Sequence, residues 1–159
     1  YQYLEVASYK IFDVNIRKPF YDINVLSDLM HKADFIKFND EELYEIAADL
    51  GSPFHNLEQN LHFIAAKTKT KRICVTKGEH GAVLLFDDKL YYNSGFLVDV
   101  VDTVGSGDSF LATLIHNLTA NVSPQNSLDL ACAVGALVAS NKGANAIITK
   151  ESIDNFMHS

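Results

Sequence analysis

Cysteine is scarce in this chain, and the motifs that would give it a function are missing. Only two cysteines occur among 159 residues. The sequence has no Cys-x-x-Cys, no His-Glu-x-x-His and no Gly-x-x-x-x-Gly-Lys-Ser/Thr pattern, so zinc chemistry and P-loop nucleotide binding have no support. Cys74 and Cys132 lie far apart in apolar segments. We therefore expect reduced, buried thiols of a cytoplasmic protein and no disulfide framework.

Positive charge is also in short supply. Thirteen Lys and Arg residues against 20 Asp and Glu give a formal net charge of −7, which disfavours nucleic acid and anionic membranes as partners. No apolar run reaches the length of a membrane span, and no secretory leader is visible. The apolar share of 48% in 159 residues is typical of a soluble, globular chain, and we expect one domain over residues 1–159.

Short apolar runs alternate with helical patterns in the first half of the chain. The pattern predicts strands at Lys10–Val14, Asp34–Phe38 and Arg72–Thr76, and helices at Asn24–His31, Asp40–Leu50 and Leu57–Thr68. The last of these strands contains Ile-Cys-Val, as expected of a strand buried on both faces. Strands that alternate with helices at this spacing predict an α/β fold with a mostly parallel sheet flanked by helices.

The second half begins differently and ends in helices. The sequence predicts a hairpin from Ala82–Phe86 and Leu90–Asn93 around Asp87-Asp88, a strand at Phe96–Val101, and helices at Gly107–Asn121, Pro124–Lys142 and Lys150–Met157. Ser123 is the expected N-cap of the middle helix, and Gly143 is expected to end it.

The most informative stretch is Asp102-Thr103-Val104-Gly105-Ser106-Gly107-Asp108-Ser109-Phe110. It reads as a glycine-rich turn that opens a helix, where backbone N–H groups and the helix dipole together favour an anion. A carboxylate at such a place is unfavourable unless it does chemistry, and a general base on a hydroxyl that attacks a phosphate is the economical role for Asp108. The simpler alternative is an ordinary glycine turn with an acid in the first helical turn.

Three further constellations follow predicted strands. Asn15 and Arg17 alternate with apolar neighbours beyond the first strand, and an Arg there suits a phosphate or carboxylate. Asn39 and Glu42 open a helix, where an N-cap with first-turn acids is the plain alternative to a role near a metal. Gly78 and Gly81 punctuate the turn after Thr76, so the backbone there can approach a ligand closely. His80 in that turn is expected to be solvated.

The nine-residue stretch resembles the C-terminal signature of the pfkB-type, ribokinase-like carbohydrate kinases, Asp-Thr-x-Gly-Ala-Gly-Asp-x-Phe, with Ser106 in place of the usual alanine. The other elements are similar to the family's Asp-x-Asn-x-Arg, Asn-x-x-Glu and Thr-x-Gly-x-x-Gly segments. The Asp-x-Asn-x-Arg segment is the one found in fructokinases and 2-keto-3-deoxygluconate kinases. The resemblance implies a ribokinase-like fold and transfer of the γ-phosphate of ATP to a sugar hydroxyl.

The resemblance also implies roles for individual residues. Asp108 would be the catalytic base, with Gly105, Ser106 and Gly107 as the anion hole. Asn15 and Arg17 would approach the sugar or the phosphate, and Glu42 would act on Mg²⁺ through water. The nucleotide contacts would be Asn39, Thr76, Lys77, Gly78, Gly81 and Cys132, although Cys132 is as well explained by packing. A monovalent cation such as K⁺ would be held by backbone carbonyls of Asp102, Val104, Val138, Asn141 and Gly143.

The resemblance covers the C-terminal half of a family member, so we expect the N-terminal half and the small β lid to be missing. On that expectation the chain alone should bind ATP weakly, phosphorylate no sugar, and expose an edge that favours a homo-oligomer. Fructokinase is the leading interpretation and 2-keto-3-deoxygluconate kinase the second. A non-catalytic nucleotide-binding remnant that needs a partner chain is the alternative from another class. A dinucleotide-binding dehydrogenase is disfavoured because Phe110 occupies the place of the third glycine.

Overall fold

The apolar runs of the chain form the strands of one sheet in the computed structural model, which describes residues 2–17, 20–141 and 148–158. The sheet has the order β1-β2-β3-β4-β5, from β1 (Ile11–Asp13), β2 (Phe35–Asn39), β3 (Arg72–Thr76), β4 (Ala82–Phe86) and β5 (Lys89–Asn93). The first three strands are parallel, with Asp13 beside Lys37 and Asn39 beside Thr76. The predicted α/β class is confirmed.

Contacts divide the chain into two compact units: unit 1 holds residues 1–77 and 83–90, and unit 2 holds residues 78–82 and 91–159. The expectation of a single domain therefore remains a prediction. Unit 2 includes the glycine turn after β3 together with the glycine turn at Gly105.

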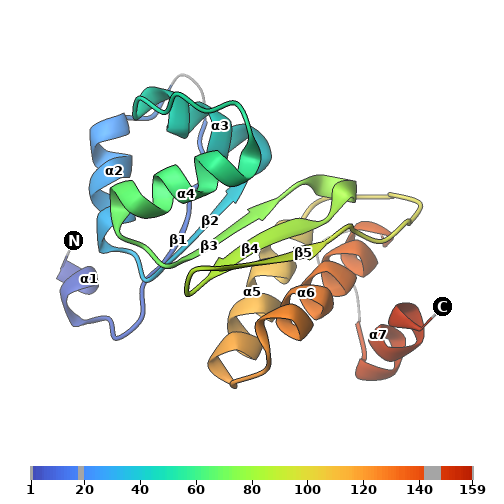
Figure 1. Cartoon of the computed structure of the whole chain (residues 1–159). Coiled ribbons are helices and arrows are strands. Elements are labelled where there is room, and N and C mark those ends of the chain that lie inside the picture. The colour runs from blue at the N-terminus through green and yellow to red at the C-terminus, as the bar shows by residue number, and fades with distance from the viewer. Residues whose placement is uncertain (1, 18–19, 142–147, 159) are drawn as a thin grey trace. The chain divides into compact units, whose positions relative to one another are not determined.

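In unit 1, helices α2 (Ile23–Lys32), α3 (Asp40–Asp49) and α4 (Leu57–Thr68) cover one face of β1–β3 (Figure 1). Alternate residues of β2 and β3 enter the core under these helices, namely Ile36, Phe38, Ile73 and Val75. The intervening residues, including Lys37 and Cys74, therefore belong to the opposite face. A short helix, α1 (Gln2–Val6), precedes the sheet and was not anticipated.

The hairpin of β4 and β5 turns through two residues with positive φ, Asp87 at 47° and Asp88 at 68°. A two-residue turn of this kind matches the twist of the strands it joins, so the predicted hairpin is confirmed. The amide of Asp87 donates to the carbonyl of Lys71 at 3.0 Å. This bond joins the end of β4 to the start of β3, so these two strands run antiparallel and the sheet is mixed.

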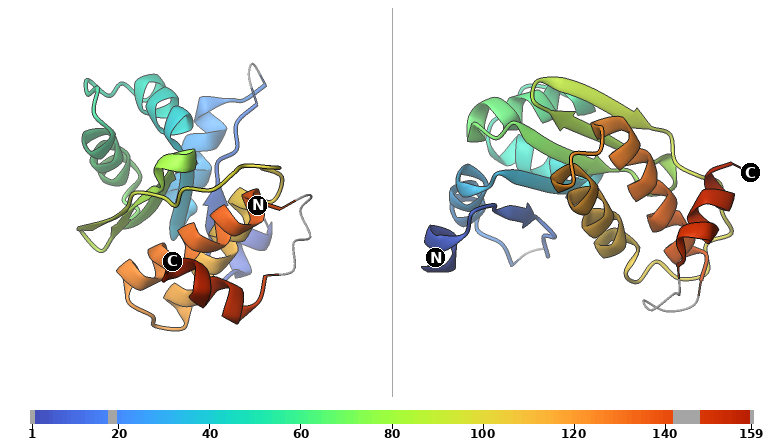
Figure 2. Two further views of the ribbon diagram at one scale, coloured as in Figure 1. Left: turned by 90° about the vertical axis from the view of Figure 1, so that its right-hand side faces the viewer. Right: turned by 90° about the horizontal axis from the view of Figure 1, so that it is seen from below.

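Unit 2 is built on α5 (Ser106–Thr119) and α6 (Pro124–Ala139), which pack side by side (Figure 2). Their shared core contains Phe110, Leu114, Leu128 and Ala131. Helix α7 (Lys150–Met157) contacts α6, and the ring of Phe156 lies 5.1 Å from that of Phe96. Among the described residues, none of these helices has the length and apolarity to cross a membrane.

Two predictions for unit 2 are wrong. Residues 94–100 form no strand, because the amides of Val101 and Asp102 donate to the carbonyl of Ala139 at 2.8 and 3.1 Å instead of to a neighbouring strand. Leu97, Val100 and Val101 are exposed there. Helix α6 ends at Ala139 and not at Lys142, because the side chains of Ser140 and Asn141 bond to the carbonyl of Leu137. The predicted helix stop, Gly143, lies outside the described residues.

Candidate functional site

The segment after β1 presents two exposed polar side chains, Asn15 and Arg17. The parallel pairing of β1 with β2 ends at Asp13, followed by one further bond from the amide of Val14 to the carbonyl of Lys37 at 3.0 Å. Asn15 then adopts a φ of 40°, a left-handed conformation that Asn tolerates better than most residues. The chain turns out of the sheet at its carboxyl edge, where ligands bind in open α/β sheets.

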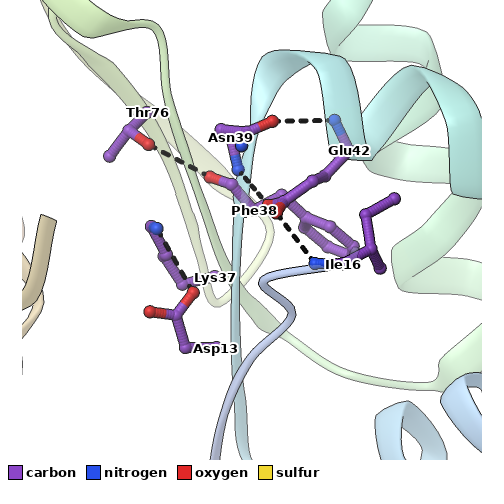
Figure 3. A network of polar contacts seen from close by, with 7 residues as sticks. All are labelled: Asp13, Ile16, Lys37, Phe38, Asn39, Glu42 and Thr76. Carbon is purple, nitrogen blue, oxygen red and sulfur yellow. Dashed lines mark hydrogen bonds and ion pairs between the residues drawn. The ribbon is translucent and has the colours of Figure 1, made fainter. Parts of the chain in front are cut away.

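At the end of β2, Asn39 and Glu42 form a capping box for α3 (Figure 3). The Oδ1 of Asn39 accepts the amide of Glu42 at 2.8 Å, and the Oε2 of Glu42 accepts the amide of Asn39 at 2.8 Å. The second carboxylate oxygen, Oε1, accepts the amide of Ile16 at 3.1 Å. The side chain of Glu42 is buried, with 6% of the residue's surface exposed.

On the other side of the ribbon, Lys37 and Asp13 form an ion pair with 3.2 Å between Nζ and Oδ1 (Figure 3). They are direct neighbours across β1 and β2. Thr76, at the end of β3, donates from Oγ1 to the carbonyl of Phe38 at 3.3 Å. Asp13, Lys37 and Thr76 thus lie toward the carboxyl ends of three neighbouring parallel strands in unit 1. The ion pair was not predicted, because nothing in the sequence sets the register of two strands.

The glycine turn after β3 lies against the residues that follow β5. Gly81 and Gly95 have φ of 77° and 86°, and a Cβ on either would collide with backbone atoms of the other segment. The carbonyl oxygen of Asn93 is the atom nearest to an added Cβ on Gly81, and the Oδ1 of Asn93 accepts the amide of Gly95 at 2.8 Å. Its Nδ2 donates to Asp129 on α6 at 2.7 Å. At Gly81 the turn therefore packs closely against protein backbone. At Gly78 the space is open, because an added Cβ there would meet nothing within 4 Å.

The turn at Gly105 opens α5 without a side-chain cap. Gly105 is the N-cap residue, has a φ of 81° and, being glycine, offers no side-chain acceptor to the first amides of the helix. The amides of Ser106 and Ser109 donate to the carbonyls of Thr103 and Gly105. Within the described parts of the chain, the amides of Gly107 and Asp108 have no hydrogen-bond acceptor. Two free N–H groups at the start of a 14-residue helix form a site suited to an anion.

Ser106 faces α6 instead of the helix start. Its Oγ donates to the carbonyl of Gly135 at 3.0 Å, and a Cβ on Gly135 would lie 3.4 Å from the Cβ of Phe110. The missing side chain of Gly135 thus allows α5 and α6 to approach closely at the turn. Asp108 is exposed at the third position of α5.

The predicted cation positions are partly brought together. The amide of Asp102 donates to the carbonyl of Ala139 at the C-terminus of α6. The carbonyl of Val138 accepts the amide of Asn141 at 3.1 Å, and Val104 donates its amide to Asp102 Oδ1 at 3.0 Å. Gly143 lies outside the described residues. Cys132 is buried in α6, as is Cys74 in β3, and neither forms a disulfide. His80 is exposed, as expected.

Magnesium was predicted to meet Glu42 through a water molecule. In the described residues no group of three or more His, Cys, Asp and Glu side chains could hold a metal ion. Both oxygens of Glu42 accept backbone amides, so the residues of unit 1 do not fit direct coordination and leave at most a contact through water.

Residues 2–151 match the sequence model of the family described as "pfkB family carbohydrate kinase". The chain belongs to this family. A fructokinase of Salmonella thompson is 30% identical to this chain over 144 residues, which cover 84% of the chain and 63% of that relative. The chain thus spans less than two thirds of that relative's length.

Two solved structures show the same fold. The ribokinase of Thermotoga maritima has a TM-score of 0.82 at 19% identity, with 99% of this chain and 52% of that chain covered. A fructokinase of Vibrio cholerae, solved with fructose, ADP and a potassium ion, has a TM-score of 0.78 at 26% identity, with 98% and 52% covered. The predicted ribokinase-like fold is confirmed.

Proposed function

We propose that this chain is the nucleotide-binding part of an ATP-dependent sugar kinase that phosphorylates a sugar hydroxyl, with fructose as the substrate. The observation that carries the proposal is the pair of unpaired amides, Gly107 and Asp108, behind the positive-φ cap Gly105. These donors would accept the charge that spreads over the γ-phosphate oxygens during transfer.

Asp108 is the proposed general base. The sugar hydroxyl gives its proton to the Asp108 carboxylate, its oxygen forms the new bond to the γ-phosphorus, and the bond to the β-phosphate oxygen breaks to release ADP. The exposure of this carboxylate next to unpaired amides supports the role of a base that receives the proton beside the phosphate. Phosphoryl transfer asks the protein mainly to position the groups and stabilise charge, and both can be supplied by this turn.

The nucleotide and acceptor contacts are assigned by the same motifs. We assign Asn39, Thr76, Lys77, Gly78 and Gly81 to the nucleotide, and Asn15 and Arg17 to the acceptor or its phosphate. The exposure of Asn15 and Arg17 at the carboxyl edge of the sheet supports their role, because Arg binds phosphate with two parallel donors. The burial of Cys132 supports packing against α5 more than contact with adenine.

Fructose is favoured because the similar proteins of Salmonella thompson and Vibrio cholerae are fructokinases. 2-Keto-3-deoxygluconate is the second candidate, since its kinases share the Asp-x-Asn-x-Arg segment. The potassium ion in the Vibrio cholerae structure supports a monovalent site on carbonyls of Asp102, Val104, Val138 and Asn141. Mg²⁺ would enter with the nucleotide phosphates, which supply oxygen ligands of the kind it prefers. We further propose a cytoplasmic enzyme that forms homo-oligomers.

An assay of ADP release by the full-length protein of which this chain is the proposed part, with fructose or 2-keto-3-deoxygluconate as acceptor and paired with calorimetric titration of ATP, tests the proposal. Fructose-dependent ADP release supports fructokinase activity, and release only with 2-keto-3-deoxygluconate supports the second candidate. ATP binding without release for any acceptor would favour a non-catalytic nucleotide-binding chain. Absence of ATP binding would overturn the assignment of Gly105–Asp108.

A further inference from the structure

The carboxylate of Glu42 does more than a capping box requires. A capping box needs one acceptor at the third helical position, and Gln serves as well as Glu there. In this chain Oε2 accepts the amide of Asn39 at 2.8 Å, while Oε1 accepts the amide of Ile16 at 3.1 Å (Figure 3). Gln would replace one of these two oxygens by an NH₂ group, so in this arrangement one of the two amides would lose its acceptor. The geometry of this site therefore demands Glu.

The amide of Ile16 has no place in the sheet. The parallel pairs of β1 and β2 end at Asp13 and Lys37, and the amide of Val14 makes the last ladder bond to the carbonyl of Lys37. The positive φ of Asn15 then turns the chain away. Beyond that turn, the bond from Ile16 to Glu42 joins this segment to the start of α3, 26 residues along the chain.

The residues on either side of Ile16 are Asn15 and Arg17, the two exposed side chains assigned to the acceptor. A long side chain such as Arg recognises an anion well only when its backbone is held, because otherwise binding must also order the segment. Three successive contacts hold this backbone to β2 and α3: the ion pair of Asp13, the amide of Val14 and the amide of Ile16. Only the last lies between the two exposed residues.

We propose that Glu42 is a positioning residue that fixes the Asn15–Arg17 segment through the Ile16 amide, and so couples the acceptor segment to the Asn39 end of β2. This inference rests on the proposed function for its kinetic consequence, but not for its structural one. It assigns to Glu42 a role that does not pass through a metal ion.

The test compares Glu42→Gln with Glu41→Gln in the purified protein. Glu41 precedes Glu42 in the same helical turn and is exposed, so its variant makes the same charge change without touching the amides. Hydrogen exchange followed by NMR is the first readout. We expect the Ile16 amide to exchange about tenfold faster in Glu42→Gln than in Glu41→Gln, the scale of losing a hydrogen bond to a charged group.

Steady-state kinetics of the full-length protein with fructose and ATP, with the same two substitutions, is the second readout. We expect Glu42→Gln to raise the KM for fructose about tenfold while the KM for ATP changes less than about twofold. An unchanged Ile16 exchange rate would overturn the proposal, and so would a selective rise in the KM for ATP or in the magnesium requirement. If the protein has no kinase activity, the proposed function fails and the exchange readout still decides the role of Glu42.

The unaltered protein provides a check that does not depend on any variant folding. Its Ile16 amide should exchange at least about tenfold more slowly than an unstructured amide, although it lies outside every strand and helix. Exchange at the unstructured rate would overturn the proposal directly.

Discussion

Gly81 and Gly95 face each other so closely that neither position has room for a Cβ. An added Cβ at Gly81 would collide with the amide nitrogen of Gly95, and one at Gly95 would come within 2.8 Å of the amide nitrogen of Gly81. Both residues also have positive φ. The backbone that follows β5 therefore packs directly against the turn that we assign to the nucleotide.

The first prediction concerns this contact. We expect Gly81→Ala and Gly95→Ala each to lower the free energy of unfolding by at least about 2 kcal/mol, since strain at positive φ adds to the backbone clash. Denaturant unfolding measures the loss. Gly51→Ala is the matched control, because Gly51 has a φ of 85° with nothing within 4 Å of its added Cβ. Equal losses in all three variants would show that the contact between the two segments has no energetic weight.

Several elements are predicted correctly by signals that lie within or beside them in the sequence. Helices Leu57–Thr68 and Lys150–Met157 and the strand Arg72–Thr76 have their predicted bounds. Side chains of Asn56 and Thr149 cap the two helices, and such caps are readable because they act within one turn. The hairpin is predictable for a similar reason, since two adjacent Asp residues tolerate the positive φ of its turn.

What the sequence could not predict depends on distant partners. Phe96–Val101 has strand-like composition, yet its end is held by the carbonyl of Ala139, and β-propensity is realised only beside another strand. The bond between Glu42 and Ile16 and the bond between Asn93 and Asp129 join residues 26 and 36 positions apart. The motif predicts a Glu at position 42, but nothing local shows that its second oxygen reaches Ile16.

The second prediction concerns Gly107, whose amide has no acceptor among the described residues. Gly107→Val should weaken ATP binding at least about tenfold, because a branched Cβ obstructs the approach of phosphate to the start of α5. Gly107→Ala should weaken it less, because a single methyl group fills less of that space. Calorimetric titration measures both. Equal affinities for the folded variants and the unaltered protein would mean that the turn has only a structural role.

The third prediction concerns Tyr21, whose hydroxyl lies 2.6 Å from Glu45 Oε1 and 2.8 Å from Asp49 Oδ2 on α3. The hydrogen bond to Glu45, which has the largest effect, and the hydrogen bond to Asp49 raise the pKa of Tyr21 well above its ordinary value. A raised folded-state pKa means that the protonated phenol stabilises the fold below the unfolded pKa of about 10, and that this contribution is lost as pH rises through the folded value.

Tyr21→Phe should therefore lower the free energy of unfolding at neutral pH, and the difference from the unaltered protein should shrink in strong alkali. Absorbance titration of the tyrosines should also lose its most alkaline step in this variant. Tyr44→Phe, which alters an exposed tyrosine on α3, is the control. A most alkaline step that persists in Tyr21→Phe would contradict the pairing with Glu45 and Asp49.

The fourth prediction concerns Asp108, the exposed acid at the third position of α5. If it takes the proton of the attacking hydroxyl, Asp108→Asn in the full-length enzyme should lower kcat by about 10²–10⁴-fold, the range found for loss of a general base. ATP affinity should stay within a few-fold, because the backbone N–H groups at the start of α5 remain. The Asn side chain also has almost the same shape as that of Asp. Asp154→Asn on α7 controls for the loss of one exposed negative charge.

Turnover and calorimetric titration separate the two effects, since a base acts on the chemical step and not on nucleotide binding. Near-normal kcat in Asp108→Asn would remove this residue from the mechanism, and a large loss of ATP affinity would make it a nucleotide contact instead.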